Sequence, residues 1–296
     1  MSCPALVNRP DMRVRWEVLS AGEDKVEAQI WEPDQQPSKA ILFCPGFPGA
    51  GAGLFEQRHA ASIVEAGYAL IVLRHAGTRL DGPCAPAMIN NGARLQQGRM
   101  RGETHIGGGG PSNIAAWLRE PFTALAAISD DYEDIFVLGN SFGALAALWS
   151  MGEAGARLDK VRHLLLLAGA QGVLEDGGVT DIMRLWKAAY MAMPRVTERI
   201  SLSDPVADEA TLLACYKDLP RRAKNITDSI GLDALVVARD EILTRSDAEK
   251  FQAAIGGRGT IYMNDIDRAY ADPPLLAHDM PDYPTAALLA LLENAP

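Results

Sequence analysis

The sequence predicts an α/β protein built on one mostly parallel β-sheet with helices on both faces. Three observations carry this prediction. Short apolar runs that end at Gly, Pro or a polar residue recur along the chain, as strands do when both sheet faces are covered. Stretches with helical periodicity lie between these runs. Near the N-terminus, two other stretches alternate apolar and polar residues, which is typical of half-exposed antiparallel strands.

The predicted elements follow the chain in a regular order. Residues 13–18 and 26–31 change character at every position and predict the two antiparallel strands. Apolar runs predict six more strands, of which the last is the weakest: 40–43, 69–73, 135–138, 164–167, 234–237 and 260–263. Helical patterns cover 54–66, 113–128, 142–152, 246–255 and 284–293. The fourth helix opens with Ser246 and Glu249 at the spacing of a capping box. This succession predicts a doubly wound, eight-stranded sheet.

Two stretches do not fit the alternation. Residues 74–111 form a long Gly-rich passage, and residues 169–233 are far longer than an ordinary connection between two core strands. We predict that 169–233 is a helical cap inserted between strands six and seven, above the edge of the sheet where open α/β folds bind ligands. The core would then comprise residues 1–168 and 234–296.

Charge argues against two classes of partner. The 296 residues include 28 Lys and Arg against 38 Asp and Glu, a formal net charge of −10. A negative surplus repels phosphate backbones and anionic lipid, so we expect neither nucleic acid nor a membrane as partner. The expected partner is a small-molecule substrate, and a homo-oligomer stays open.

Cysteine usage and the N-terminal residues bear on location. The four cysteines are scattered without a CxxC pair, which favours reduced thiols. Two prolines and charged residues interrupt residues 1–11 before an apolar targeting segment could form. No run approaches the roughly 18 apolar residues of a membrane helix. We therefore expect a cytoplasmic protein.

The strongest chemical signal is the pentapeptide Gly139-Asn140-Ser141-Phe142-Gly143, between the strand 135–138 and a helical run. A G-x-S-x-G sequence keeps small residues around the serine because the turn from strand to helix is tight. The turn exposes the hydroxyl above the sheet and at a helix N-terminus, where the dipole favours an anion. This context predicts that Ser141 is a nucleophile.

On these residues the sequence resembles the α/β-hydrolase superfamily over nearly all of its length, and the resemblance implies the α/β-hydrolase fold. In that family an acid and then a histidine follow the serine along the chain. Of five histidines only His278 lies beyond the seventh strand, and it precedes the last helix as the family expects. The loop that leads to it is longer than usual. The resemblance implies that Asp240, just after the seventh strand, is the acid, with its neighbour Glu241 as the alternative.

Two backbone amides should form the oxyanion hole that the resemblance implies. One is the amide of Phe142, directly after the nucleophile. The other is the amide of Phe47, in a loop that resembles the family's H-G-F-P-G sequence with Pro45 in place of the histidine. Pro48 lacks an N–H and fixes its own φ, which helps to hold this loop.

Further residues are candidates for contact with the substrate. Arg74 and His75 replace an acidic, Gly-rich segment of the family and could bind an anionic group on a substrate. Asn140 adjoins the nucleophile, and Trp186 and Met191 lie in the predicted cap. No His, Cys, Asp or Glu cluster has metal-ligand spacing, so we expect no metal and no cofactor.

Together these features predict a serine hydrolase that cleaves a small or medium apolar ester, thioester or lactone through an acyl-enzyme on Ser141. Three alternatives remain open. The same elbow resembles that of carbon–carbon bond hydrolases of aromatic ring cleavage. An aminopeptidase-like hydrolase is the second alternative, and a catalytically silent ligand-binding member of the fold is the third.

Overall fold

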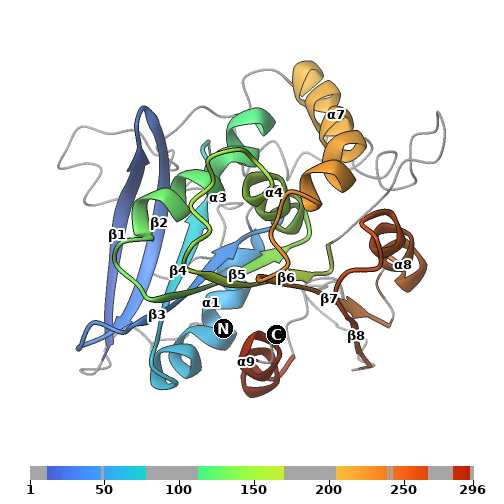
Figure 1. The fold of residues 1–296 in the computed structure, drawn as a ribbon. Helices are drawn as coiled ribbons and strands as arrows, with labels where there is room; N and C mark the ends of the chain where they lie inside the picture. Colours follow the sequence, from blue (N-terminus) through green and yellow to red (C-terminus); the bar gives the residue numbers. More distant parts are fainter. Residues whose placement is uncertain are drawn as a thin grey trace.

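The computed structural model describes residues 12–47, 50–77, 113–169, 205–238, 240, 243–265 and 283–293. In these parts of the chain, eight strands form one sheet in the order β1-β2-β4-β3-β5-β6-β7-β8 (Figure 1). The strands are β1 (Met12–Ala21), β2 (Asp24–Pro33), β3 (Lys39–Cys44), β4 (Tyr68–Arg74), β5 (Asp134–Asn140), β6 (Val161–Leu167), β7 (Gly231–Val237) and β8 (Ile261–Asn264). β2 is antiparallel to both β1 and β4, and every other pair is parallel. The predicted mostly parallel sheet is confirmed.

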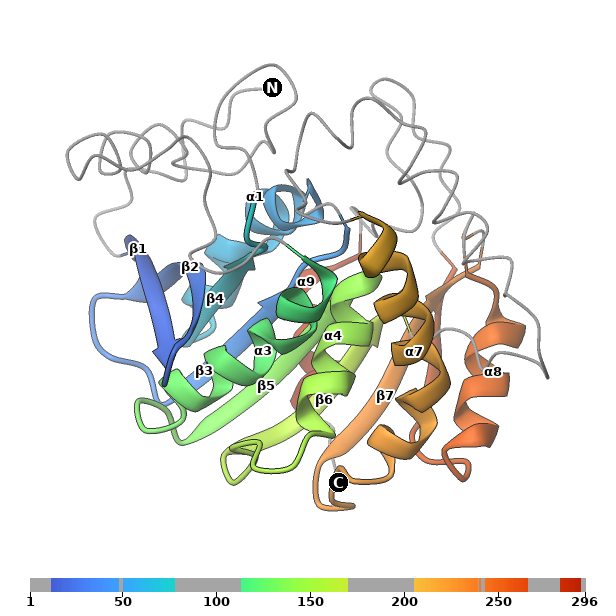
Figure 2. The same cartoon turned by 90° about the horizontal axis from the view of Figure 1, so that it is seen from above.

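Helices cover both faces of this sheet. They are α1 (Ala50–Glu65), α3 (Ile114–Ile128), α4 (Phe142–Met151), α7 (Pro205–Ala223), α8 (Arg245–Ala254) and α9 (Thr285–Glu293). In β3, Ile41 and Phe43 point to the face under α1 and α9, while Ala40 and Leu42 point to the other. Figure 2 shows α3, α4 and α7 side by side on that second face. Two buried apolar layers result, which is why the central strands read as continuous apolar runs.

The position of α7 corrects part of the predicted cap. Leu212, Cys215, Tyr216 and Leu219 are buried in the same apolar cluster as the inner faces of α3 and α4. The helix that these residues form therefore belongs to the layer that flanks the sheet, not to a cap above its edge. Of the rest of the predicted cap, residues 170–204 lie outside the described residues, and 231–233 belong to β7.

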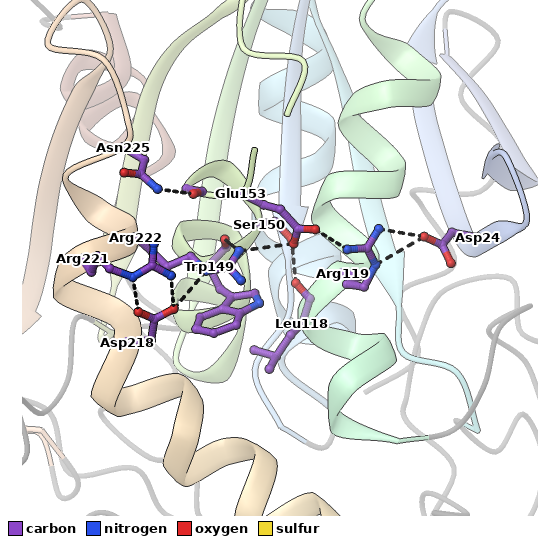
Figure 3. Close-up of polar contacts among 11 residues, drawn as sticks. Asp24, Leu118, Arg119, Trp149, Ser150, Glu153, Asp218, Arg221, Arg222 and Asn225 are labelled. Atoms are coloured by element: carbon purple, nitrogen blue, oxygen red, sulfur yellow. Dashed lines mark hydrogen bonds and ion pairs between the residues drawn. The ribbon is translucent and has the colours of Figure 1, made fainter. Parts of the chain in front are cut away.

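Ion pairs fix the end of α7 to the end of α4 (Figure 3). The guanidinium of Arg222 lies 3.7 Å over the ring of Trp149 and donates to the Trp149 carbonyl oxygen and to Glu153. A cation at the C-terminal carbonyls of α4 also complements the helix dipole. Glu153 in turn pairs with Arg119 of α3, which bonds Asp24, the first residue of β2. The network thus joins three neighbouring helices and the edge of the sheet.

The N-terminus of α3 is capped from two segments of the chain. Asn113 accepts a hydrogen bond from the N–H of Ala116 at 2.8 Å. The buried carboxylate of Asp208, in the first turn of α7, accepts one from the N–H of Ile114 at 2.7 Å. A carboxylate at this position satisfies a free amide and complements the helix dipole. Asp208 therefore links the start of α7 to the start of α3.

We expect Asp208→Ala to lower the free energy of unfolding by about 1–2 kcal/mol, because the variant leaves a buried helix amide without its acceptor. Urea denaturation followed by circular dichroism measures the change. Asp228→Ala is the matched control, since the Asp228 side chain is fully exposed and its pair with Arg258 spans 3.7 Å. Equal losses in the two variants would contradict the capping role.

The start of α8 differs from the predicted capping box. The cap residue is Thr244, in extended conformation, and not Ser246. The Thr244 hydroxyl accepts from the N–H of Asp247, and the Asp247 carboxylate accepts from the N–H of Thr244 at 2.9 Å. Ser246 is the second residue of the helix and lies within its first turn, so it is not at the cap position.

A buried histidine links α1 to α9. The Nδ1 atom of His59 lies 2.8 Å from the hydroxyl of Thr285, and its ring contacts Phe55. Burial lowers the pKa of His59 to about 4, and the charge of the neighbouring Arg58 adds to this effect.

This shift predicts a loss of stability in acid. The unfolded chain binds the proton below about pH 6.5, whereas folded His59 stays neutral down to about pH 4. The free energy of unfolding should therefore fall as the pH drops through this window, by about 3 kcal/mol from this group. His59→Gln removes the titrating ring but keeps a polar side chain, so its urea midpoint should depend less on pH between 7 and 4. If the urea midpoints of the variant and the wild type changed equally with pH, His59 would not be the source of the acid sensitivity.

Within the described ranges, none of the helices combines the length and the apolar character required to cross a bilayer.

Candidate active site

Ser141 lies between the last residue of β5 and the first residue of α4, in a strained backbone conformation. Its φ is 52° and its ψ is −118°, a region that residues with a Cβ rarely adopt. Its N–H donates to the carbonyl oxygen of Leu167, at the end of β6, at 2.9 Å. Strain of this kind costs about 1–3 kcal/mol, persists only where the surroundings enforce it, and clusters at functional sites.

Packing explains both glycines of the pentapeptide. A Cβ on Gly139 would overlap the backbone of Ala144 in the first turn of α4. A Cβ on Gly143 would overlap the carbonyl oxygen of Cys44 at the end of β3. The helix can therefore approach β3 and β5 closely only where both residues lack a side chain, and this approach creates the sharp turn at Ser141.

The loop that follows β3 passes directly beside the serine. A Cβ on Gly46 would lie 3.0 Å from the Cβ of Ser141 and 3.2 Å from the Oδ1 atom of Asn140. Phe142 is the first residue of α4, so its N–H is among the amides that the helix leaves without an internal acceptor. The structure thus brings together the predicted nucleophile, one predicted oxyanion amide and the loop after β3, in which Phe47 carries the second. Pro48 lies outside the described residues.

Asp240 follows the C-terminal end of β7. Its Oδ1 atom accepts a hydrogen bond from the N–H of Leu243 at 2.8 Å, which fixes the carboxylate within its own loop. β5, β6 and β7 are parallel neighbours, so Asp240 and Ser141 lie at the same edge of the sheet. His278 and Glu241 lie outside the described residues.

Two of the predicted substrate contacts have other partners in the structure. Asn140 is buried, and its Nδ2 atom donates to the Leu167 carbonyl oxygen at 3.3 Å. This bond stabilises the turn at Ser141, whose own N–H donates to the same oxygen. Arg74 is also buried, with its guanidinium 4.6 Å over the ring of Trp16. These contacts favour structural roles for both residues. Trp186 and Met191 lie outside the described residues.

His75, the third predicted substrate contact, lies beneath the loop after β3. It is 2% exposed, with Nε2 3.1 Å from the carbonyl oxygen of Pro45 and Nδ1 2.6 Å from Oε2 of Glu120. Both ring nitrogens face acceptors inside the protein, which favours a role in holding the loop over contact with a substrate. Burial raises the pKa of Glu120, while His75 and the Ala76 N–H oppose this effect.

Sequence reasoning missed Glu120 and Trp117, both on the inner face of α3. The available signal was a carboxylate among the buried positions of a helix, since a buried acid needs a partner.

Cys44, at the end of β3, is the other potential nucleophile close to this loop. Burial raises the pKa of its thiol, and the carboxylate of Glu120 raises it further. The thiol therefore stays protonated at neutral pH and is a poor nucleophile. Among the residues that the structure describes, no group of three or more His, Cys, Asp or Glu side chains could hold a metal ion.

Comparisons of the sequence with family models and with curated proteins found no match. Solved structures match over nearly the whole chain. A highly thermostable carboxyl esterase from Bacillus coagulans aligns with a TM-score of 0.56 at 15% identity, over 97% of this chain and 99% of its own. A lipase-esterase related protein from Clostridium acetobutylicum aligns with a TM-score of 0.52 at 15% identity, over 96% and 99%. A thioesterase domain from the curacin biosynthetic pathway gives 0.51 at 11% identity, over 96% and 100%. The strand order, the serine turn between β5 and α4, and these similarities together show that the chain has the α/β-hydrolase fold.

Proposed function

We propose that this protein is a serine hydrolase that cleaves esters or thioesters through an acyl-enzyme on Ser141. The observation that carries the proposal is the strained backbone of Ser141 at the N-terminus of α4, directly beside the loop 45–47. A fold that only needed to close this turn would favour glycine at a φ of 52°. A serine held there against strain is the arrangement that presents a hydroxyl to a substrate.

The proposed mechanism uses residues from four separate parts of the chain. His278 removes the proton from the Ser141 hydroxyl as the oxygen attacks the acyl carbon, and Asp240 orients the imidazole. The amides of Phe142 and Phe47 stabilise the negative charge on the tetrahedral oxygen. His278 then protonates the leaving alcohol or thiol. Water, deprotonated by His278, attacks the acyl-enzyme and releases the carboxylic acid.

The proposed substrate is a small or medium apolar acyl compound, including thioesters and lactones. The apolar side chains at Trp186 and Met191 support it, as does the net charge of −10, which disfavours polyanionic substrates. Proteins of the same fold include the carboxyl esterase and the thioesterase domain named above.

The test combines covalent labelling with a substrate series. A fluorophosphonate probe should react with the protein, and peptide mass spectrometry should place the adduct on Ser141. Ser150→Ala is the matched control, because Ser150 is a buried serine of the same helix that donates to Leu118. This variant should be labelled at the wild-type rate. A panel of p-nitrophenyl esters of increasing chain length, thioesters and lactones would define the acyl group. An adduct on another residue would refute the proposal.

A further inference from the structure

The loop that carries the proposed oxyanion amide of Phe47 is held by a hydrogen bond from one buried imidazole, that of His75. The Pro45 carbonyl oxygen can only accept a hydrogen bond, so the Nε2 atom of His75, 3.1 Å away, must carry a proton. The peptide unit between Pro45 and Gly46 is planar, so the direction of its carbonyl also sets the direction of the Gly46 N–H. His75 therefore fixes the orientation of the backbone one residue before Phe47.

Glu120 determines which nitrogen of His75 carries this proton. Its Oε1 atom accepts from the N–H of Ala76 at 3.0 Å, and its Oε2 atom lies 2.6 Å from Nδ1 of His75. One proton lies between Oε2 and Nδ1, either on a glutamic acid beside a neutral ring or on an imidazolium beside a carboxylate. In both arrangements Nε2 keeps its own proton, and the buried pair carries no net charge. The bond to Pro45 is therefore preserved.

Trp117 joins this pair to both oxyanion residues. Its ring stacks on His75 with centroids 4.6 Å apart and an interplanar angle of 11°. The same ring lies 6.0 Å from the ring of Phe47 and 6.1 Å from that of Phe142. Its Nε1 atom donates to the carbonyl oxygen of Ala76 at 2.9 Å. The two residues whose amides would bind the oxyanion thus contact one fully buried side chain.

We propose that His75 is a positioning residue for the oxyanion hole, held by Glu120 and Trp117, and that it acts on catalysis through the Pro45 carbonyl. This inference rests on the proposed function. It assigns His75 an effect on the transition state and none on binding of the ground state, because the ring is buried beneath the loop.

His75→Phe tests the inference because phenylalanine keeps the stack on Trp117 and removes both hydrogen bonds. We expect kcat for a p-nitrophenyl ester to fall about tenfold to a hundredfold with KM within twofold, since a displaced donor loses part of its stabilisation of the oxyanion. The inhibition constant of an alkyl boronic acid, which forms a tetrahedral adduct, should rise by a similar factor. The inhibition constant of the carboxylate product should stay within twofold.

Two variants of Glu120 separate positioning from bulk packing. Glu120→Leu should lower kcat as His75→Phe does. Glu120→Gln should recover most of that loss, because its amide can donate to Nδ1 of His75 and accept from the N–H of Ala76. If Glu120 contributed only to stability, the recovery of kcat in Glu120→Gln would not be accompanied by a recovery of the inhibition constant of the alkyl boronic acid.

His163→Phe is the matched control. His163 is a fully buried histidine near the amino end of β6, with Nδ1 3.1 Å from the Leu292 carbonyl oxygen. Its replacement should lower the melting temperature but leave kcat within twofold. The inference is overturned if His75→Phe keeps the wild-type kcat, if Glu120→Gln is as slow as Glu120→Leu, or if His163→Phe is equally slow. Ser141→Ala, assayed in parallel, must keep less than a hundredth of the wild-type kcat. A higher rate there would refute the proposed function itself.

Discussion

Ser141→Ala is expected to reduce kcat for any ester substrate by roughly 10⁴- to 10⁶-fold, the effect of removing the nucleophile from a serine triad. The amides of Phe142 and Phe47 would remain, so the variant should still bind substrates with little change in affinity. Steady-state hydrolysis of a p-nitrophenyl ester measures the loss, and rapid mixing should show that the acylation burst is gone. A variant that keeps even a hundredth of the wild-type rate would assign the chemistry to another residue.

Ser141→Gly adds a test of the strain. Both variants lack the hydroxyl, and the glycine variant also lacks the Cβ, which is disfavoured at a φ of 52° and a ψ of −118°. We expect Ser141→Gly to be more stable than Ser141→Ala by about 1 kcal/mol in urea denaturation, despite the greater freedom of glycine in the unfolded chain. A less stable glycine variant would mean that the turn is relaxed. The expected order would show that the protein keeps the serine at the expense of stability.

The sequence predicted the architecture because the physical cause of each central strand is local. A run such as Ile135–Leu138 must be covered on both faces, and this requirement is visible without knowledge of its neighbours. The packing of α7 was not visible in the same way. Its apolar positions, among them Leu212 and Tyr216, predict a helix but do not specify which surface covers them.

The cap of α8 illustrates a second limit. Thr244 with Asp247 and Ser246 with Glu249 have the same spacing, and both pairs place an acid three residues after a hydroxyl residue, as a capping box does. The choice between them depends on where the chain from β7 turns into the helix, which is a property of the tertiary structure. Such a boundary cannot be read from local spacing.

In the candidate site, too, the features with a local cause could be predicted from the sequence and those that depend on tertiary packing could not. The nucleophile was predictable, because the tight turn around Ser141 imposes small residues at fixed positions beside it. The pairing of His75 with Glu120 was not, since 45 positions separate them and only the packing of α3 against the sheet brings them together. The sequence-based expectation that His75 contacts substrate arose from the composition of its segment, without knowledge of the carbonyl and carboxylate that face its ring.

Gly143→Ala is expected to unfold the protein partly or lower its stability by about 3 kcal/mol or more. Helix propensity alone predicts the opposite sign, because alanine is favoured over glycine inside a helix by about 1 kcal/mol. The contact decides the outcome. The added Cβ would overlap the carbonyl oxygen of Cys44, a backbone atom at the end of the central strand β3 that cannot rotate away. Relief requires α4 to move away from β3, and that movement separates Ser141 from the loop at Gly46.

Activity should fall together with stability for this reason, by about 10²-fold in kcat for protein that remains folded, since a shift of about 1 Å is enough to misplace an oxyanion donor. Gly155→Ala is the matched control. At Gly155 φ is 84° and a Cβ would meet no atom within 4 Å, so the cost is backbone strain of about 1–2 kcal/mol with kcat unchanged. Urea denaturation and ester hydrolysis on both variants separate strain from overlap. A Gly143→Ala variant that is more stable than the wild type and fully active would mean that the close approach of α4 to β3 does not create the turn at Ser141.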